Sequence, residues 1–319
     1  MSEERKMRPK VSVIMATYNR AHLIEKSLDS IKNQTSSLWE CIVVDDRSTD
    51  NTGEIVSSFC KKDPRFIYHV RPIDRPKGPS ACRNFGIENA QGNYIQFFDD
   101  DDIMFPVLIE EKLSIIENSN IDVVIAPSLA FNVKKQNFTK QNEVFSENLV
   151  SDYVTGKLTW YCCGPLWRKE FLTERFDENI QTLEDWDFNL RNIYKNPKAK
   201  YLKQPLQQYN RYELGKTLST KAQLGDERQV ISGFMAYKKH FELLKKQNKI
   251  TQHIKRWLMQ RFTFLLRASL AGNFNISNQI FQFMYRNQKI NDLKRFWKII
   301  LGYYCFKTFN KGYRLLKSY

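Results

Sequence analysis

Three groups of acidic residues stand where carboxylates can do chemistry. Four consecutive aspartates, Asp99–Asp102, directly follow the apolar run IQFF. Asp45 and Asp46 follow the apolar run CIVV, and Glu184 and Asp185 open the segment EDWDFNLR. Carboxylates bind divalent cations, accept hydrogen bonds from ribose or base groups, and act as general bases. The three groups therefore predict a site that holds a charged ligand and moves a proton.

The run Asp99–Asp102 has three interpretations. A solvated loop with helix-capping acids is one, but four adjacent like charges repel one another and a cap needs only one acid. An all-protein calcium loop needs alternating acids and a glycine, and this spacing is absent. The third is Mn²⁺ or Mg²⁺ held by one or two carboxylates together with the diphosphate of a ligand. We favour this metal site, because a bound cation relieves the repulsion.

The other two groups also have competing interpretations. Asp45 and Asp46 can cap the following helix, or they can accept hydrogen bonds from a ribose or a base. Arg83 is either a surface arginine or a residue that approaches a base or phosphate. Thr182 and Asp185 are spaced as a capping box. Alternatively, Asp185 is a general base that the helix N-terminus keeps ionised.

Strand and helix patterns alternate through the first 130 residues, at intervals of roughly 25–30 residues. We expect strands at 10–19, 39–46, 65–70, 93–98 and 121–131, with helices between the first four and again after the fourth. This alternation predicts an α/β fold with a mainly parallel, Rossmann-like sheet flanked by helices. Because such sheets bind ligands beyond the carboxyl ends of their strands, the polar ends of the first, second and fourth strands should lie on one rim.

The pattern changes beyond residue 130. The polar stretch 132–148 predicts a loop or irregular segment, a helix is expected within 176–195, and the chain is expected to be helical from about 224 onward. We therefore divide the chain into residues 1–125, residues 126–223 and a helical, basic extension, 224–319.

Positive charge is concentrated near the C-terminus. Residues 251–319 contain 13 Lys or Arg and one acid, a net charge of +12, whereas the whole chain carries +15. Basic residues interleaved with Trp, Phe and Tyr suit the surface of an anionic membrane. A nucleic acid or a merely solvated basic helix would explain the same charge. We favour the membrane surface and expect no nucleic-acid partner.

Other features indicate the compartment. No window is long and apolar enough for a transmembrane helix, and the segment MSEERKMRPK lacks the apolar core of a secretory signal. The six cysteines show neither C-x-x-C pairs nor zinc-site spacing, so we expect reduced thiols. These features predict a cytoplasmic protein, peripheral at the inner face of the plasma membrane.

Five segments together resemble family 2 glycosyltransferases with the A-type nucleotide-sugar fold (GT-A). They occur in the order and spacing of that family: VSVIMATYNR, IVVDDRSTDNT, GPSACRNFGI, GNYIQFFDDDD with Pro106, and EDWDFNLR. The resemblance covers residues 10–215, weakens between 125 and 180, and does not reach the C-terminal segment. Arg47 stands where the family usually has glycine, and Cys82 replaces a common alanine.

The resemblance implies which residues bind the nucleotide. Thr17 and Tyr18 would lie near the base, with Tyr18 stacking on it. Asp46 would hold the base, usually uracil, with Asp45 beside it, and Arg83 would lie by the nucleotide. Residues 1–125 would then be the nucleotide-sugar-binding half of the catalytic domain, and residues 126–223 the acceptor-binding half with the catalytic base.

The resemblance also implies the roles of the remaining acids. Asp99 and Asp101 fit the D-x-D metal motif, with Asp101 the stronger ligand, and Asp100 would face the ribose. Asp185 would be the catalytic base, with Glu184 beside it. The fourth acid of the run, Asp102, would support the loop.

The implied reaction is a metal-dependent, inverting transfer of a hexosyl or N-acetylhexosaminyl group from a nucleoside-diphosphate sugar, usually a UDP-sugar. The acceptor would be a saccharide, carried on a membrane lipid, in capsule, O-antigen or other surface polysaccharide synthesis. A nucleotidyltransferase on a similar sheet and a non-catalytic sugar-binding protein remain the alternatives.

Overall fold

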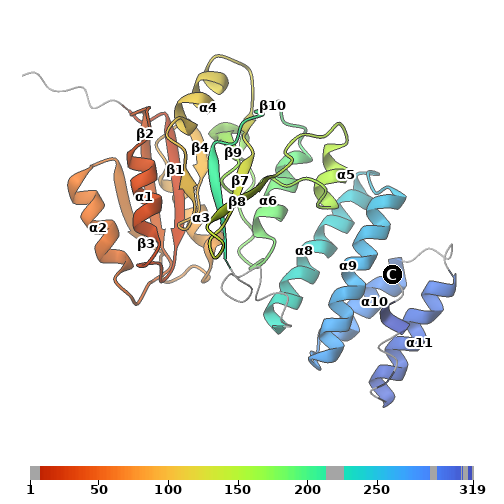
Figure 1. Cartoon of the computed structure of the whole chain (residues 1–319). Coiled ribbons are helices and arrows are strands. Elements are labelled where there is room, and N and C mark those ends of the chain that lie inside the picture. The colour runs from red at the N-terminus through yellow and green to blue at the C-terminus, as the bar shows by residue number, and fades with distance from the viewer. Residues whose placement is uncertain (1–7, 213–225, 288–292, 310, 312–314, 318–319) are drawn as a thin grey trace, which may run out of the picture. The chain divides into compact units, whose positions relative to one another are not determined.

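The computed structural model describes residues 8–212, 226–287, 293–309, 311 and 315–317, with only the backbone described at 293–296 and 317. The chain forms two compact units (Figure 1). Unit 1 comprises the residues up to 179 together with 184–212, and unit 2 comprises 180–183 and the residues from 213 onward. The predicted boundary at residue 223 lies outside the described residues. The predicted division at residue 125 stays a prediction.

Unit 1 is built on a seven-stranded sheet with the order β10-β6-β9-β4-β1-β2-β3. All neighbouring strands are parallel except β9, which runs antiparallel to both β4 and β6. The strands are β1 (Val11–Thr17), β2 (Trp39–Asp45), β3 (Phe66–Val70), β4 (Tyr94–Phe97), β6 (Val123–Ile125), β9 (Pro165–Arg168) and β10 (Ala199–Tyr201). This arrangement confirms the prediction of a mainly parallel sheet.

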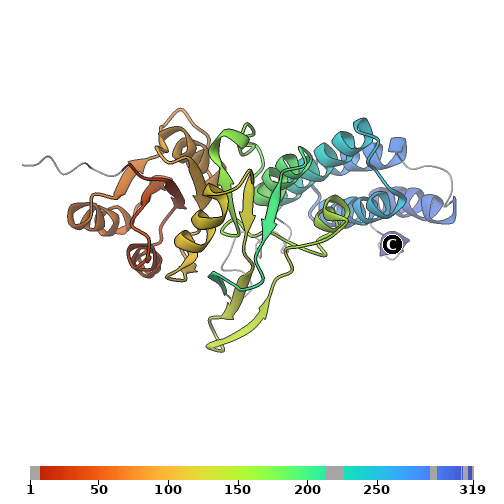
Figure 2. The ribbon, with the colours of Figure 1, turned by 90° about the horizontal axis from the view of Figure 1, so that it is seen from above.

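Helices cover both faces of this sheet (Figure 2). Three of them share one hydrophobic core with alternate residues of β1 and β2: α1 (Ile24–Lys32), α2 (Thr52–Lys62) and α4 (Leu108–Glu117). On the opposite face, α3 (Pro79–Asn89) brings Gly86 against Ile14 of β1. There too, Phe188 of α6 (Glu184–Ile193) packs edge-on against Phe97 of β4, with 5.5 Å between ring centroids. The apolar residues thus alternate between two faces, as a sheet covered on both sides requires.

The strand register brings three polar strand ends to one rim. Thr17 pairs with Asp45 across β1 and β2, and Ile14 pairs with Phe97 across β1 and β4. Because these strands are parallel, their carboxyl ends point the same way. The prediction that the residues after β1, β2 and β4 lie on one rim is confirmed.

A second, four-stranded sheet corrects two predictions. It has the order β5-β11-β7-β8, formed by β5 (Ile103–Met104), β7 (Ser128–Asn132), β8 (Asn137–Gln141) and β11 (Gln207–Arg211). The predicted strand 121–131 is in fact two strands, β6 and β7, in different sheets. The predicted irregular segment 132–148 contains β8, which pairs with β7. The rest of unit 1 includes α5 (Leu149–Val154) and the short 3₁₀ helix η1 (Lys169–Phe171).

Unit 2 is helical over its described residues from 227 onward, as predicted. Its helices are α8 (Glu227–Lys246), α9 (Gln252–Ala271), α10 (Ser277–Asn287), α11 (Leu293–Phe309) and the 3₁₀ helix η4 (Leu315–Lys317). Asp226 caps α8 by accepting a hydrogen bond from Arg228, and Thr251 caps α9 in the same way through Ile254. Within the described residues, no helix has both the length and the apolar composition needed to cross a membrane.

All six cysteines are free thiols, as expected from their spacing. Cys41 and Cys82 lie buried in unit 1, and burial raises the pKa of both thiols, that of Cys82 to about 12. Inert, buried thiols of this kind act as small apolar side chains.

Gly92, between α3 and β4, allows a close approach to β1. Helix α3 ends at Asn89, three residues before this glycine. A Cβ atom on Gly92 would lie 2.7 Å from the Ser12 nitrogen and 2.8 Å from the Lys10 oxygen. Both are backbone atoms of the strand region and cannot move alone.

We expect Gly92→Ala to lower the free energy of unfolding by about 1–3 kcal/mol, because the new methyl group displaces β1. The neighbouring Gln91 is exposed, so Gln91→Ala is the control and should change the free energy of unfolding by less than about 0.5 kcal/mol. Urea unfolding followed by circular dichroism measures both. Equal midpoints for Gly92→Ala and the unmodified protein would contradict the close approach.

Candidate functional site

The four aspartates after β4 point to different partners. Arg83 of α3 donates a hydrogen bond to Asp99 at 2.9 Å. Arg20, just after β1, lies 3.4 Å from an Asp100 oxygen and 3.7 Å from an Asp101 oxygen. Two arginines from separate segments therefore offset three of the four negative charges.

Asp102 points into the protein and holds the loop in place. Its side chain is fully buried. One oxygen accepts a hydrogen bond from the Asn210 backbone at 2.9 Å, and the other accepts one from the Cys163 thiol at 3.6 Å. The side-chain amide of Asn210 also donates a hydrogen bond, to the backbone carbonyl oxygen of Asp101 at 2.5 Å. Strand β11 thus fixes the loop through one residue, and Asp102 has the supporting position that the resemblance implied.

The carboxyl groups of Asp100 and Asp101 ionise less readily than exposed aspartates. Burial, followed by the charge of Asp101, raises the pKa of Asp100 to about 7 although Arg20 opposes the shift. Burial and then Asp99 raise the pKa of Asp101 to about 6. Like charges that are held together out of water favour protonation. A bound cation would favour the ionised forms.

The nucleotide residues predicted at the end of β1 lie on the same rim. Thr17 is the last residue of β1 and is buried, and its neighbour Tyr18 is 40% exposed. The Lys77 ammonium lies 3.8 Å from the centre of the Tyr18 ring. An exposed aromatic ring beside a cation suits the stacking of a base with a nearby diphosphate.

Asp45 is engaged by the protein on both oxygens. Ser48 donates to one oxygen from its backbone nitrogen and its hydroxyl, each at 2.7 Å, and the Tyr68 hydroxyl donates to the other at 2.7 Å. These bonds form the turn between β2 and α2. Arg47, within the turn, has a φ of 63°, the left-handed region that favours glycine. The turn therefore keeps a glycine-like conformation despite the arginine.

Asp46 forms a buried ion pair with Arg71, which follows β3. The Arg71 Nε donates to Asp46 Oδ1, and the same guanidinium donates to the Pro72 and Arg75 carbonyl oxygens. Both side chains are 7% exposed. A carboxylate has about four acceptor positions, and this pair engages one oxygen, so Asp46 retains more capacity for a ligand than Asp45.

Arg83 joins Asp99, in the acidic run after β4, to Glu184, the neighbour of the predicted base Asp185. It is buried, which rules out the surface-arginine interpretation, and it donates to Glu184 at 3.2 Å as well as to Asp99. Burial alone would lower the pKa of Arg83, but the surrounding negative groups raise it well above its ordinary value. The arginine therefore stays charged and links α6 to the loop after β4.

Asp185 lies in the first turn of α6, next to Glu184. Burial and then Glu184 raise the pKa of Asp185 to about 7, while Arg83 and a hydrogen bond from the Trp186 backbone at 2.7 Å oppose the shift. The helix begins at Glu184, and Leu183 before it has a φ of 66°. Thr182 therefore does not directly precede the helix, which argues against the capping-box interpretation.

The acids after β4 fit a divalent cation that is completed by a ligand. Among the described residues, no three His, Cys, Asp or Glu side chains are already arranged around a metal position. Asp99 and Asp101 are the two partly exposed acids of the run, with side chains 31% and 17% exposed. Carboxylate oxygens are hard ligands that suit Mn²⁺ or Mg²⁺, with water and phosphate filling the other positions.

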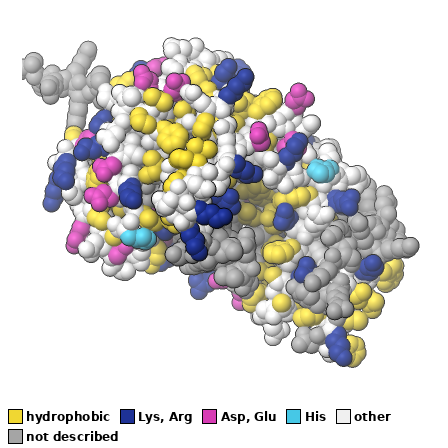
Figure 3. Space-filling view, in the orientation of Figure 1, with side chains coloured by type: hydrophobic (Ala, Val, Ile, Leu, Met, Phe, Trp, Pro, Cys, Tyr) yellow, Lys and Arg dark blue, Asp and Glu magenta, His cyan; other side chains and the backbone are white. Residues whose placement is uncertain are grey.

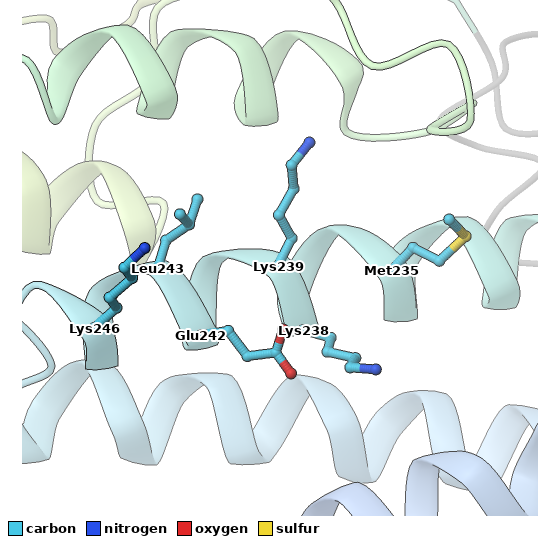
Figure 4. Close-up of a pocket in the computed structure, with 6 residues that line it drawn as sticks. All are labelled: Met235, Lys238, Lys239, Glu242, Leu243 and Lys246. Atoms are coloured by element: carbon cyan, nitrogen blue, oxygen red, sulfur yellow. The ribbon is translucent and has the colours of Figure 1, made fainter.

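A pocket elsewhere contains none of the predicted residues. It is lined by one stretch of α8 (Figure 4): Met235, Lys238, Lys239, Glu242, Leu243 and Lys246. The predicted donor, metal and base residues all belong to unit 1. Three lysines and a single acid on one helix show no arrangement for proton transfer, so the rim of the sheet remains the candidate active site.

The sequence analysis did not identify four residues that the site uses: Arg20, Arg71, Lys77 and Asn210. Arg20 lies in the segment TYNR, and its place directly after a strand end was a usable signal. Arg71 follows the short strand β3, and Asn210 lies in the short strand β11. The aspartates that they contact are distant in sequence, so no local pattern identifies them.

Known proteins resemble the chain in sequence. The uncharacterized glycosyltransferase EpsJ of Bacillus subtilis is 32% identical over 224 residues, which cover 64% of this chain and 61% of EpsJ. A GalNAc(5)-diNAcBac-PP-undecaprenol beta-1,3-glucosyltransferase of Campylobacter jejuni is 42% identical over 94 residues, 30% of each protein. The chain thus spans less than two thirds of the length of these relatives.

Solved structures share the fold. S. aureus TarS 1–349 in complex with UDP-GlcNAc has a TM-score of 0.55 at 20% identity, and the match covers 93% of this chain and 81% of TarS 1–349. The mannosyltransferase PcManGT of Pyrobaculum calidifontis, in complex with GDP-Man and Mn²⁺, has a TM-score of 0.53 at 16% identity. The match covers 98% of this chain and 86% of the PcManGT chain. The predicted GT-A fold is therefore confirmed.

The family model described as glycosyl transferase family 2 matches residues 12–176, just over half of the chain. The match begins in β1 and includes the rim residues of β1, β2 and β4. The chain belongs to glycosyl transferase family 2.

Proposed function

We propose that the protein is an inverting, metal-dependent glycosyltransferase. It moves a hexosyl or N-acetylhexosaminyl group from a UDP-sugar to a saccharide acceptor on a lipid carrier, in surface polysaccharide synthesis. One observation carries the proposal: Arg83 hydrogen-bonds both Asp99 of the acidic loop and Glu184 beside Asp185. One cation thus links the loop that would bind the donor to the residue beside the carboxylate that would act as the base.

The donor would bind across the rim. Tyr18 would stack on the base, Asp46 would accept hydrogen bonds from it, and Asp100 would face the ribose, with Thr17 and Asp45 supporting them. Asp101 and Asp99 are the residues that would hold Mn²⁺ or Mg²⁺, whose charge neutralises the diphosphate leaving group. Arg20 and Lys77 add positive charge on the same rim, which favours a dianionic donor.

Asp185 would act as the base. Its carboxylate removes the proton from an acceptor hydroxyl, and that oxygen forms a bond to C1 of the donor sugar as the bond from C1 to the diphosphate breaks. Attack from the opposite face inverts the anomeric centre. A pKa raised to about 7 suits this role, since a base works best when its pKa lies near the working pH. Glu184 supports the raised pKa from beside it.

Known relatives support the choice of substrates. The Campylobacter jejuni relative is named for an undecaprenol diphosphate saccharide, TarS was solved with UDP-GlcNAc, and PcManGT with GDP-Man and Mn²⁺. By analogy we assign residues 1–125 to the donor and residues 126–223 to the acceptor. The extension 224–319 would place the enzyme at the inner face of the plasma membrane, where a lipid-linked acceptor is accessible.

A panel of nucleotide sugars tests the proposal, with and without Mn²⁺ and with a lipid-diphosphate saccharide as acceptor. Release of a nucleoside diphosphate that depends on Mn²⁺ and on one donor is the expected result. Release of pyrophosphate would identify a nucleotidyltransferase instead. Binding of a donor without turnover would identify a sugar-binding protein, and turnover without metal would remove the roles of Asp99 and Asp101.

Asp185→Asn should lower kcat by about 10²–10⁴-fold, because the amide cannot accept the acceptor proton. Donor affinity should stay within about twofold, since the proposed donor contacts lie on other residues. Single-turnover assays and donor titrations measure the two effects separately. Glu54→Gln, an exposed acid-to-amide change on α2, is the control. If the kcat of Asp185→Asn stays within tenfold of the kcat of the unmodified enzyme, Asp185 is excluded as the base.

The pH profile provides an independent test. Asp185 must be ionised to accept a proton, so kcat/KM should fall about tenfold per pH unit below its pKa of about 7 and level off above it. Arg83 lowers this pKa, so Arg83→Gln should move the midpoint to higher pH. A profile that stays flat between about pH 5 and pH 8 would contradict the assignment.

A further inference from the structure

Helix α11 has an inner face that packs within unit 2. Ile299 and Tyr303 are 4% and 2% exposed. The Tyr303 ring stacks on Phe281 of α10 with 4.0 Å between centroids, and its hydroxyl donates to Asn278 at 3.3 Å. On the same side, a Cβ atom on Gly302 would lie 3.0 Å from Leu316 of η4. This face is fixed by the neighbouring helices.

The opposite face of α11 exposes large apolar side chains. Trp297, Leu301 and Tyr304 are 59%, 55% and 56% exposed. Their spacing of four and three residues places them on one stripe of a helix that turns about 100° per residue. By the same rotation, this stripe lies about 180° from the centre of the buried face. We call these three residues the outer stripe.

Positive charge borders the outer stripe on both sides. Lys298 and Lys307 are exposed, and the helical rotation places them roughly 90° to either side of it. Residues 293–309 contain no acid. Figure 3 shows hydrophobic and basic side chains next to each other in the region of α11, at the lower right. An apolar stripe between cations is the pattern of a helix that lies in a membrane interface.

We propose that the outer stripe of α11 binds the surface of an anionic lipid bilayer, with Lys298 and Lys307 contacting lipid phosphates. Trp and Tyr favour the headgroup level, and lysine stems extend along apolar surface to reach phosphate groups. Leu301 lies between the two aromatic residues and has no π-face to stack on a base, which disfavours a nucleic acid. The charge of residues 251–319 complements anionic lipid.

This inference deepens the proposed function and rests on it in one respect. Membrane binding is useful to the enzyme because the proposed acceptor is linked to a lipid. The binding itself needs neither donor nor acceptor. Sedimentation of the full chain with phosphatidylglycerol-containing vesicles therefore tests it without turnover. Binding without turnover would contradict the proposed reaction alone. Failure to bind, with turnover of a water-soluble acceptor, would contradict this inference alone.

The unmodified chain should bind vesicles that contain phosphatidylglycerol and bind pure phosphatidylcholine vesicles at least tenfold more weakly. The double variant Trp297→Ser with Leu301→Ser should bind the anionic vesicles at least tenfold more weakly than the unmodified chain. A matched control, Met235→Ser with Phe264→Ser, removes exposed apolar side chains from α8 and α9 and should bind within about twofold. Equal binding by the outer-stripe variant and the control would overturn the proposal.

Charge reversal gives a second test that does not alter the apolar stripe. The loss of one surface lysine weakens binding to an anionic bilayer by about fivefold, or about 1 kcal/mol. Lys298→Glu with Lys307→Glu reverses two charges and should therefore weaken vesicle binding by more than about fivefold. Added salt should reduce the difference in binding between this variant and the unmodified chain. Circular dichroism and the Tm should be unchanged in each variant, because the altered side chains are exposed. Tighter binding to single-stranded RNA than to the anionic vesicles, or a dimer that the outer-stripe variant abolishes, would overturn the proposal in favour of those partners.

Discussion

Four adjacent carboxylates at the end of a buried strand must each find compensation, and this constraint shapes the candidate site. Like charges at such short range disfavour ionisation strongly when water is excluded. The protein divides the four among partners from different parts of unit 1: Arg20 after β1, Arg83 of α3 and Asn210 of β11. The first strand, the third helix and the second sheet therefore meet at one loop, and the acids differ in role because their partners differ.

The position of this loop could be predicted from sequence, because the information is local. An apolar run ending in acids marks a strand and its exit, and parallel strands bring such exits to one rim. The partners could not be predicted in the same way. Asn210 contacts Asp101 across 109 residues and Arg71 contacts Asp46 across 25, and no spacing rule connects them. Such pairs are determined by tertiary packing, which a single sequence does not reveal.

The second sheet was missed for a different physical reason. All five residues of β8 are exposed, so the strand carries no buried face and no apolar alternation. It pairs with β7, and its last residue, Gln141, donates a hydrogen bond to the Lys203 carbonyl oxygen at 2.9 Å. The prediction of one strand over 121–131 was wrong for the opposite reason. Only Asp122 and Ser128 interrupt its apolar residues, while the backbone leaves one sheet at Ala126 and joins another at Ser128. A hydrophobic pattern indicates which residues are buried. In these two segments, burial does not indicate which strands pair.

Arg83 explains how the acidic loop after β4 and the proposed base, Asp185, can depend on each other. A single buried cation lies 2.9 Å from an Asp99 oxygen and 3.2 Å from a Glu184 oxygen, so its charge is shared between them. The same cation holds the pKa of Asp185 below the value that burial and Glu184 would otherwise give. Any change in the charge near Asp99 alters the field at Asp185 through this shared partner. The readiness of Asp185, the proposed base, to accept a proton is thus tied to the charge of the acidic loop.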